Sequence, residues 1–235
     1  MRQLITALAL GAIGALAAGC GATNPGTPAP TTTSAPAPAP PVGVAGLDAL
    51  LLTDAEVNTA MGVTGMTVAS GTINTMDDDS ANTSDKACLF AVGTAQDKVY
   101  AGSGWTAVRT QMALNPLDNN ILSPIVTEGL VLFSSAHDAA AFFTASAQSW
   151  PACSNRRYTF SRLGASDVWT VGPNSKTNGT LSTARTKEGG NGWACQRALT
   201  VANNVAIDIL TCSDKQNDPG AVNVAHQIAA KVPTK

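Results

Sequence analysis

The stretch that decides the fold is CQRALTVANNVAIDILTC, residues 195–212. Its two arms are rich in apolar and β-branched residues and flank the pair 203–204, where Asn-Asn can adopt the positive φ of a two-residue hairpin turn. Counting outward from that turn brings Cys195 opposite Cys212 as a non-hydrogen-bonded pair. Such pairs have Cα atoms about 4.5 Å apart, a separation that a disulfide accepts. The sequence therefore predicts a hairpin over 195–212 whose open end is closed by a disulfide.

The chain of 235 residues begins with a secretory leader. Arg2 precedes an apolar run over 4–18 that is too short to span a bilayer, as is typical of a signal peptide. Residues 16–20, LAAGC, resemble the lipobox of bacterial lipoproteins, in which the cysteine receives a diacylglycerol and becomes the new N-terminus. We therefore expect a signal peptide at 1–19 and a lipid on Cys20 that anchors the protein at the extracytoplasmic face of the cell membrane. The alternative is an ordinary secretory signal that leaves Cys20 as a free thiol.

Residues 20–43 form a tether, and residues 44–235 form the folded domain. Seven of the thirteen prolines lie between residues 21 and 42, among Ala, Thr and Gly. Such a composition buries too little apolar area to fold and favours extended polyproline II. The whole chain has a net charge of -2, with 14 basic and 16 acidic residues, so it has no basic field for nucleic acid.

The remaining cysteines are even in number, as expected of a chain exported to an oxidising compartment. Once Cys195 is paired with Cys212, Cys88 and Cys153 pair by elimination. The alternative of a metal site is disfavoured because neither CxxC nor CxxH occurs. The sequence therefore predicts two disulfides and no bound metal.

The pattern of the domain predicts an α+β fold with largely antiparallel, twisted sheets and about three helices. Thr53 and Glu56 form a capping box for a helix over 54–61. Ser135 precedes an Ala- and Phe-rich helix over 136–150, and Asp218-Pro219 opens a last helix that runs to about 231. Strands are expected at 64–70, 87–92, 98–101, 104–114, 125–133, 157–161, 167–172, 180–187, 192–202 and 205–212.

No catalytic residue, cofactor or metal ligand is predicted, and we do not expect an enzyme. The sequence contains neither GxSxG nor HExxH. His137 and His226 are interpreted as surface or boundary residues. The run 77–79, Asp-Asp-Asp, lacks the alternating oxygen spacing of a calcium loop and is interpreted as a solvated loop.

The tryptophans supply the candidate cleft residues. Trp150 and Trp193 lie close to cysteines in the sequence and are expected in the core. Trp105 with Arg109, and Trp169 with Arg185, are candidates to line a groove for an apolar or anionic molecule; the alternative is core tryptophan with surface arginine. Arg197 and Asp208 lie diagonally on one face of the 195–212 hairpin, within salt-bridge reach.

Four segments together resemble the family of PknH-like extracellular sensor domains: LLLTDAEVNTAMGVTGM (50–66), VYAGSGWTAVRTQ (99–111), FSSAHDAAAFFTASAQSWPAC (133–153) and WACQRALTVANNVAIDILTC (193–212). The resemblance covers about residues 48–235. It implies a mixed α/β domain with a central cleft for an unidentified extracellular ligand, and the same two cysteine pairings. The chain has no HRD triplet, DFG triplet or glycine-rich phosphate loop, so any signal would pass through a partner.

The expected function is therefore that of a membrane-anchored binding module. Its partners would be the diacylglycerol anchor, the membrane surface and a small cell-envelope ligand held in a cleft. The alternative is a protein-interaction module that modulates an envelope enzyme or kinase. A hydrolase is a third hypothesis, and we place it last because no nucleophile–base pair can be identified.

Overall fold

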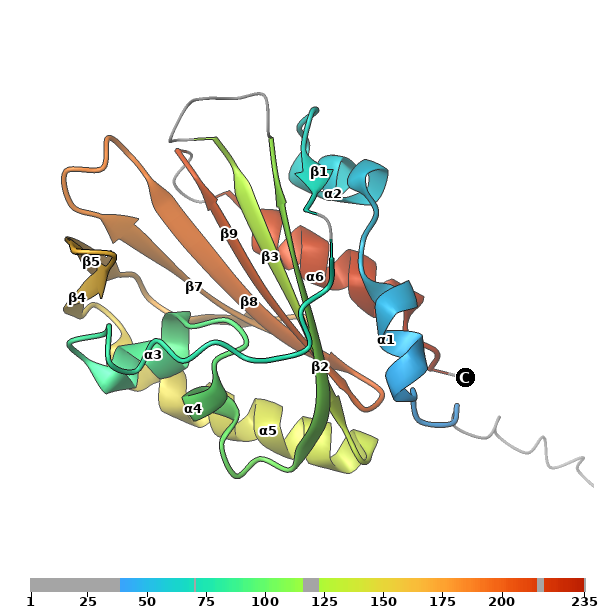
Figure 1. Ribbon diagram of the computed structural model, residues 1–235. Helices are drawn as coiled ribbons and strands as arrows, with labels where there is room; N and C mark the ends of the chain where they lie inside the picture. The colour runs from blue at the N-terminus through green and yellow to red at the C-terminus, as the bar shows by residue number, and fades with distance from the viewer. Residues whose placement is uncertain (1–38, 70, 116–122, 215–217, 235) are drawn as a thin grey trace, which may run out of the picture. The chain divides into compact units, whose positions relative to one another are not determined.

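The computed structural model describes residues 39–69, 71–115, 123–214 and 218–234, which fold around one antiparallel sheet. The predictions for the signal peptide, for Cys20 and for most of the tether lie outside the described residues. Within them, nine strands run in the order β1-β2-β3-β9-β8-β7-β5-β4, with β6 paired to β7 (Figure 1). The strands are β1 (Thr67–Val68), β2 (Trp105–Leu114), β3 (Ile125–Phe133), β4 (Arg157–Arg162), β5 (Ala165–Val171), β6 (Ser175–Thr177), β7 (Thr180–Lys187), β8 (Ala194–Ala202) and β9 (Val205–Ser213).

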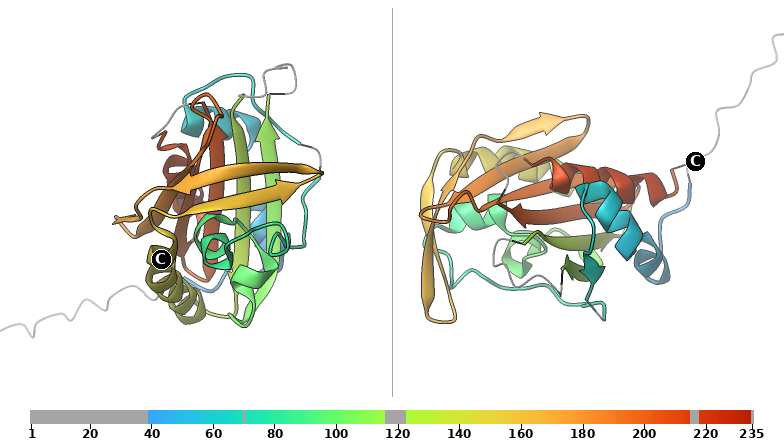
Figure 2. Two further views of the ribbon diagram at one scale, coloured as in Figure 1. Left: turned by 90° about the vertical axis from the view of Figure 1, so that its left-hand side faces the viewer. Right: turned by 90° about the horizontal axis from the view of Figure 1, so that it is seen from above.

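Helices cover both faces of this sheet (Figure 1; Figure 2). One face packs against the first, second and last helices, and the other against the three between them. A 3-10 turn over Trp150–Cys153 extends the fifth helix. The helices of the described residues are α1 (Val44–Leu50), α2 (Asp54–Met61), α3 (Lys86–Val92), α4 (Asp97–Tyr100), α5 (Ala136–Ser149) and α6 (Gly220–Lys231).

The central hairpin β8–β9 contributes to both hydrophobic cores. Ala198 and Ile207 point into the core beneath α1, α2 and α6. Leu199 and Ala206, one residue along each strand, point into the core beneath α3 and α5. A strand that is buried on both faces needs apolar residues at successive positions. This explains why the segment that decides the fold is so uniformly apolar.

Two disulfides link the elements as the sequence predicted. The hairpin disulfide joins Cys195 to Cys212, which are opposed in the β8–β9 register with a Cα–Cα distance of 4.0 Å. The α3 disulfide joins Cys88 to Cys153, which ties α3 to the 3-10 turn. Asn203 has φ 50° in the two-residue turn, as its side chain permits.

The β8–β9 turn also holds both ends of the described chain. The Asn203 side-chain nitrogen donates to the carbonyl oxygens of Pro40 (2.9 Å) and Pro233 (3.1 Å). The Asn204 side chain accepts from the Val42 amide (2.7 Å) and donates to the Val42 carbonyl (3.0 Å). The entry of the chain and its exit therefore meet at one turn.

Glu128 on β3 is a buried acid in the core beneath α1 and α2, and only 1% of it is exposed. Its Oε2 accepts from the Leu52 amide and from Gln111 Nε2, each at 3.1 Å. Burial raises the pKa of Glu128 to about 7, more than these hydrogen bonds lower it. Glu128 thereby connects the α1–α2 link to the sheet.

The sequence predictions of secondary structure differ from the structure in four places. Residues 87–92 belong to α3 and residues 98–100 to α4 rather than to strands, and residue 101 lies in a turn. The first helix, α1, was not predicted either, so the described residues hold six α-helices instead of about three. A short apolar run has no periodicity that separates a strand from a buried helix. In α3 the Asp85 side chain accepts from the Ala87 amide and starts the helix. Of the expected strand 64–70, only residues 67–68 pair with β2.

Candidate functional site

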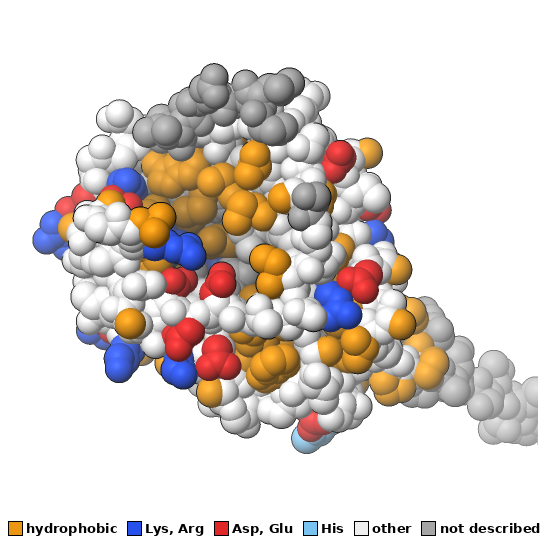
Figure 3. All heavy atoms as spheres, viewed as in Figure 1, with side chains coloured by type: hydrophobic (Ala, Val, Ile, Leu, Met, Phe, Trp, Pro, Cys, Tyr) orange, Lys and Arg blue, Asp and Glu red, His pale blue; other side chains and the backbone are white. Residues whose placement is uncertain are grey.

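A hollow of about 200 Å³ lies over the part of the sheet that α3 leaves uncovered, and we call it the sheet hollow. Figure 3 shows hydrophobic side chains in a depression of this face, with basic and acidic side chains along one edge. Its lining includes apolar side chains and two arginines from several elements: Leu89 of α3, Met112 of β2, Phe160 and Arg162 of β4, Arg185 of β7 and Leu210 of β9.

The floor of the sheet hollow is a row of three side chains across three strands. Met112 is opposite Thr127, and Thr127 is opposite Leu210, in the register of β2, β3 and β9. Opposed side chains on one face lie about 4.5–5.5 Å apart, so the row is continuous. Met112, on the strand next to the edge of the sheet, is 44% exposed. The floor is therefore an apolar surface that the described fold leaves open.

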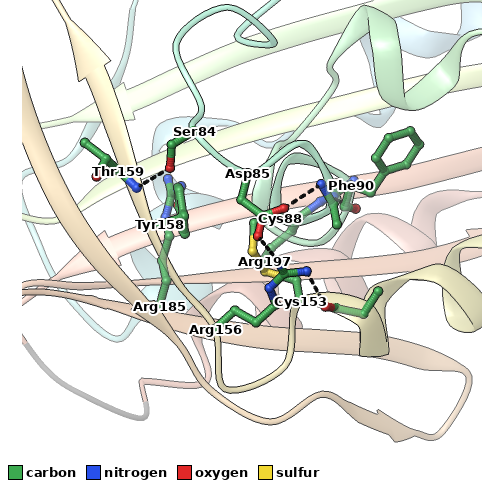
Figure 4. The surroundings of a disulfide bond; sticks show 12 residues. Ser84, Asp85, Cys88, Phe90, Cys153, Arg156, Tyr158, Thr159, Arg185 and Arg197 are labelled. Carbon is green, nitrogen blue, oxygen red and sulfur yellow. Dashed lines mark hydrogen bonds and ion pairs between the residues drawn. A yellow bond between two sulfur atoms is a disulfide. The ribbon is translucent and has the colours of Figure 1, made fainter.

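Arg185 forms part of the basic wall, and its guanidinium is held in place. The guanidinium lies 4.7 Å from the ring centre of Trp169, which is itself buried. Arg185 Nη1 donates to the Tyr158 hydroxyl, and Figure 4 shows the two side chains alongside each other. Burial raises the pKa of Tyr158, so its hydroxyl is neutral and can accept this bond.

The basic wall has no carboxylate partner within the described residues. No acidic side chain of that part lies within 4.0 Å of the charged nitrogens of Arg185 or Arg162. Arg185 Nε is buried and has no hydrogen-bond acceptor among the same residues. Arg162 is exposed at the end of β4. The wall can therefore supply hydrogen bonds and charge to an anion.

Asp77 and Asp79 line the sheet hollow on the loop before α3. The Asp79 carboxylate already accepts from Asn82 Nδ2 (3.0 Å) and from Gln96 Nε2 (3.1 Å). The Asp79 amide donates to Gln96 Oε1 at 2.7 Å. The middle residue of the run, Asp78, points to Lys98 instead, at 3.5 Å. Asp78 therefore points away from the two carboxylates that line the hollow, and no group of metal-ligating side chains forms within the described part of the chain.

The structure brings one of the two candidate tryptophan–arginine pairs together, Trp169 with Arg185, and separates the other. A β-bulge between Trp105 and Ala107 shifts the alternation of β2. Trp105 packs toward the core beneath α5, whereas Arg109 Nε donates to Asp48 of α1 at 2.9 Å on the opposite face. Trp105 and Arg109 therefore do not line one groove. Of the second pair, Arg185 lines the sheet hollow and Trp169 supports it from below.

Sequence reasoning missed Arg162 and the apolar floor. Leu210 could have been placed, because it shares a hairpin face with Asp208 and Cys212. The exposure of Leu210 could not have been predicted, because that exposure depends on where α3 ends over the sheet.

A buried ion pair holds α3 over the sheet. Arg197 Nε and Nη2 donate to the two carboxylate oxygens of Asp208, at 2.7 and 2.8 Å. Asp208 also accepts from the Ala95 amide (3.0 Å) and the Tyr100 hydroxyl (2.9 Å). Arg197 Nη1 donates to the Phe90 carbonyl at 2.8 Å, beside the α3 disulfide (Figure 4). The predicted hairpin salt bridge therefore sets the position of one wall of the hollow.

Of the two tryptophans expected in the core, Trp150 lies there and Trp193 lies at its edge. Trp150 is fully buried, and the Arg197 guanidinium lies 4.7 Å from its ring centre. Trp193 is half-buried and packs against the same core. Trp150 lies in the same 3-10 turn as Cys153 and so packs beside the α3 disulfide.

Neither histidine lines the sheet hollow. His226 Nε2 of α6 lies 2.8 Å from Thr180 Oγ1, but Thr180 is only 3% exposed, so a substrate cannot reach that hydroxyl. His137 is exposed and lies 3.6 Å from Asp138. The His226 contact joins α6 to β7, and the His137 contact lies in the first turn of α5. Neither forms an accessible nucleophile–base pair.

A second concavity, the α5 groove, has a volume of about 440 Å³ and lies between α3, α4 and α5. It is lined by successive turns of α5, including Ala141, Phe142 and Ala145, and by Phe90 and Val99. Phe90 is 38% exposed. The groove is therefore largely apolar.

None of the helices in the described ranges is both long and apolar enough to cross a membrane.

Comparison with known proteins gives one consistent result. The family described as the PknH-like extracellular domain matches residues 42–231. The serine/threonine-protein kinases PknH of Mycobacterium tuberculosis and Mycobacterium bovis are each 36% identical over 195 residues, which is 83% of this chain and 30% and 31% of theirs. The crystal structure of the extracellular domain of PknH from M. tuberculosis has a TM-score of 0.76 and 35% identity, covering 82% of this chain and 97% of that one. The chain thus spans less than a third of the curated relatives' length.

Proposed function

Because this chain belongs to the family of PknH-like extracellular domains, we propose that it is a lipid-anchored extracytoplasmic module whose sheet hollow binds a small cell-envelope ligand. The observation that carries the proposal is the open apolar floor of Met112, Thr127 and Leu210 beside a basic wall. Concave sites with apolar linings and a few converging polar groups are where proteins bind small molecules.

The relatives carry this domain on serine/threonine kinases. The 235 residues of this chain contain neither an HRD nor a DFG triplet. We therefore propose that these residues work as a non-enzymatic, sensor-type module and pass ligand binding on to a signalling domain outside them.

The anchoring part of the proposal rests on the lipobox-like residues 16–20. Two acyl chains hold a protein on a membrane without a transmembrane helix. Wild-type protein should incorporate radiolabelled palmitate and partition into detergent. Cys20→Ser should abolish both; labelling that persists in this variant would show that the lipid is elsewhere.

The binding part is tested by what the full chain retains when it is purified from its native membrane. Mass spectrometry of the extracted protein should find a small molecule in the wild type and much less in Met112→Trp, because an indole fills the floor of the hollow. Ile73→Trp is the matched control, since Ile73 is also an exposed apolar residue (57%) but does not line the hollow. Equal retention in the two variants, or no retained molecule in the wild type, would contradict the proposal.

A second function is favoured by the α5 groove. Its volume of about 440 Å³ and the exposed ring of Phe90 suit an apolar side chain or helix from a protein partner. In that case, Phe90→Asp should remove a cross-linked partner on the native membrane, and Met112→Trp should keep it. The reverse pattern would favour the sheet hollow as the partner site.

A further inference from the structure

We infer that the ligand of the sheet hollow is an amphiphile with one anionic head group, whose apolar chain lies over Met112 and Leu210 and whose head is held by Arg185 and Arg162. This inference rests on the proposed binding function and specifies its ligand class. It depends on how the apolar floor, the basic wall and the acidic wall are placed around one cavity.

The floor requires an apolar part of the ligand. Met112, Leu210 and Phe160 present aliphatic and aromatic surface to the cavity. The residue opposed between the first two, Thr127, is half-buried. Covering this surface with an alkyl chain removes it from water, which is favourable by about 25 cal/mol per Å² of apolar area.

Arg185 requires an anionic part. Its guanidinium is fixed by the Trp169 ring and by the Tyr158 hydroxyl, so little side-chain entropy is lost when a ligand binds. Arg185 Nε is buried with no acceptor among the described residues, and buried donors normally have one. A phosphate, sulfate or carboxylate can accept two parallel bonds from a guanidinium. The Arg185 guanidinium is therefore held in place and lacks an anionic partner among the described residues, so an oxyanion of the ligand can bind there.

The opposite wall limits how much negative charge the ligand carries. Asp77 and Asp79 line the same cavity as the two arginines, so the charges of the four side chains cancel. The Asp79 oxygens are already used by Asn82 and Gln96, which leaves Asp77 to accept from a hydroxyl or amine of the head group. A polyphosphate would be repelled there, whereas a single anionic group placed at the arginine wall would not.

The test uses the full mature chain carrying Cys20→Ser, so that its own lipid cannot compete. Calorimetric titrations compare dodecyl phosphate with inorganic phosphate, dodecyl maltoside and dodecyltrimethylammonium, each below its critical micelle concentration. Dodecyl phosphate should bind at least about tenfold more tightly than any of the other three. Dodecyl maltoside and dodecyltrimethylammonium cannot accept a charge-assisted hydrogen bond from an arginine, and inorganic phosphate has no alkyl chain to cover the floor.

Arginine variants locate the head group. Arg185→Gln should weaken dodecyl phosphate binding about tenfold or more and leave dodecyl maltoside within about twofold. Arg162→Gln, at an exposed position that does not threaten folding, should weaken it about threefold. Arg109→Gln is the matched control, because Arg109 lies on the opposite face of the sheet with Asp48.

The outcomes separate this inference from the proposed function. Equal affinity for anionic, neutral and cationic amphiphiles would overturn the anionic head while supporting a binding hollow. An equal effect of Arg109→Gln and Arg185→Gln would overturn the assignment of the arginines. If none of the probes binds but a native molecule is retained and lost in Met112→Trp, the ligand class is wrong and the proposed function stands. If neither occurs, both fail.

Discussion

The buried ion pair between Arg197 and Asp208 gives the sharpest prediction of stability. Asp208 is completely buried and Arg197 is 1% exposed. In Asp208→Asn, a single acceptor oxygen would face four donors, from Arg197 Nε and Nη2, the Ala95 amide and the Tyr100 hydroxyl. The new amide group would itself point at donors. The variant therefore leaves a buried guanidinium without a counter-charge.

Removal of one partner of a buried ion pair costs about 3–5 kcal/mol. Three of the four donors converge on Asp208 Oδ2, so the Asn oxygen takes that position and the Asn amide nitrogen faces Arg197 Nε. The opposed donors leave buried groups unsatisfied, which adds about 1–3 kcal/mol and places this case at the upper end. A domain of ordinary stability has about 5–15 kcal/mol in total, so Asp208→Asn should lose a large fraction of it.

The assay is equilibrium urea unfolding of the oxidised full mature chain, followed by tryptophan fluorescence. The control is Asp48→Asn, which breaks the ion pair of Arg109 with a carboxylate that is 52% exposed. That pair should contribute at most about 1 kcal/mol. A loss below about 1 kcal/mol in Asp208→Asn, or equal losses in the two variants, would refute the reasoning.

Three further predictions concern other parts of the domain. Because burial raises the pKa of Glu128 to about 7, the neutral acid stabilises the fold at low pH, and this contribution is lost as the pH rises from about 4.5 to 7. Glu128→Gln should therefore gain about 2 kcal/mol of stability relative to the wild type between pH 5 and pH 8 in urea titrations; a constant difference would contradict a buried titrating acid. Removing the α3 disulfide, which spans 65 residues, should cost about 4 kcal/mol against about 3 for the hairpin disulfide, which spans 17; the reverse order would show that the unfolded-chain entropy does not dominate. Leu163 is fully exposed with φ 52° in the β4–β5 turn, so Leu163→Asn should raise the stability by about 1 kcal/mol, and a loss would indicate an unrecognised contact.

The sequence predicts those parts of the fold that local chemistry determines. The capping box of Thr53 and Glu56 forms, and α2 ends at Met61 before Gly62, which has φ 63°. The hairpin register places Cys195 opposite Cys212 because both the turn and the alternation are local. The apolar run 87–92 is different, because α3 is selected by the Asp85 cap and by packing against the sheet rather than by its own periodicity.

The site is less predictable than the fold. The pair of Trp169 and Arg185 could be proposed from the sequence, but the support from Tyr158 and the position of the pair beside the hollow depend on the pairing of β4, β5 and β7. The β-bulge between Trp105 and Ala107 shifts the alternation of side chains along β2 and so places Trp105 and Arg109 on opposite faces. No residue in this segment predicts the bulge. Exposure of the floor at Met112 is a property of the whole fold, since it depends on where the distant segment α3 ends.

The asparagine turn of β8–β9 has a mechanical consequence. A force applied to the chain at Pro40 and Val42 acts on the turn of the central hairpin. There the side chains of Asn203 and Asn204 donate hydrogen bonds to the carbonyl oxygens of Pro40 and Val42. That hairpin cannot be unzipped from its other end, because the hairpin disulfide locks it there. A pull along the tether therefore acts first on a pair of strands that a disulfide closes at the far end.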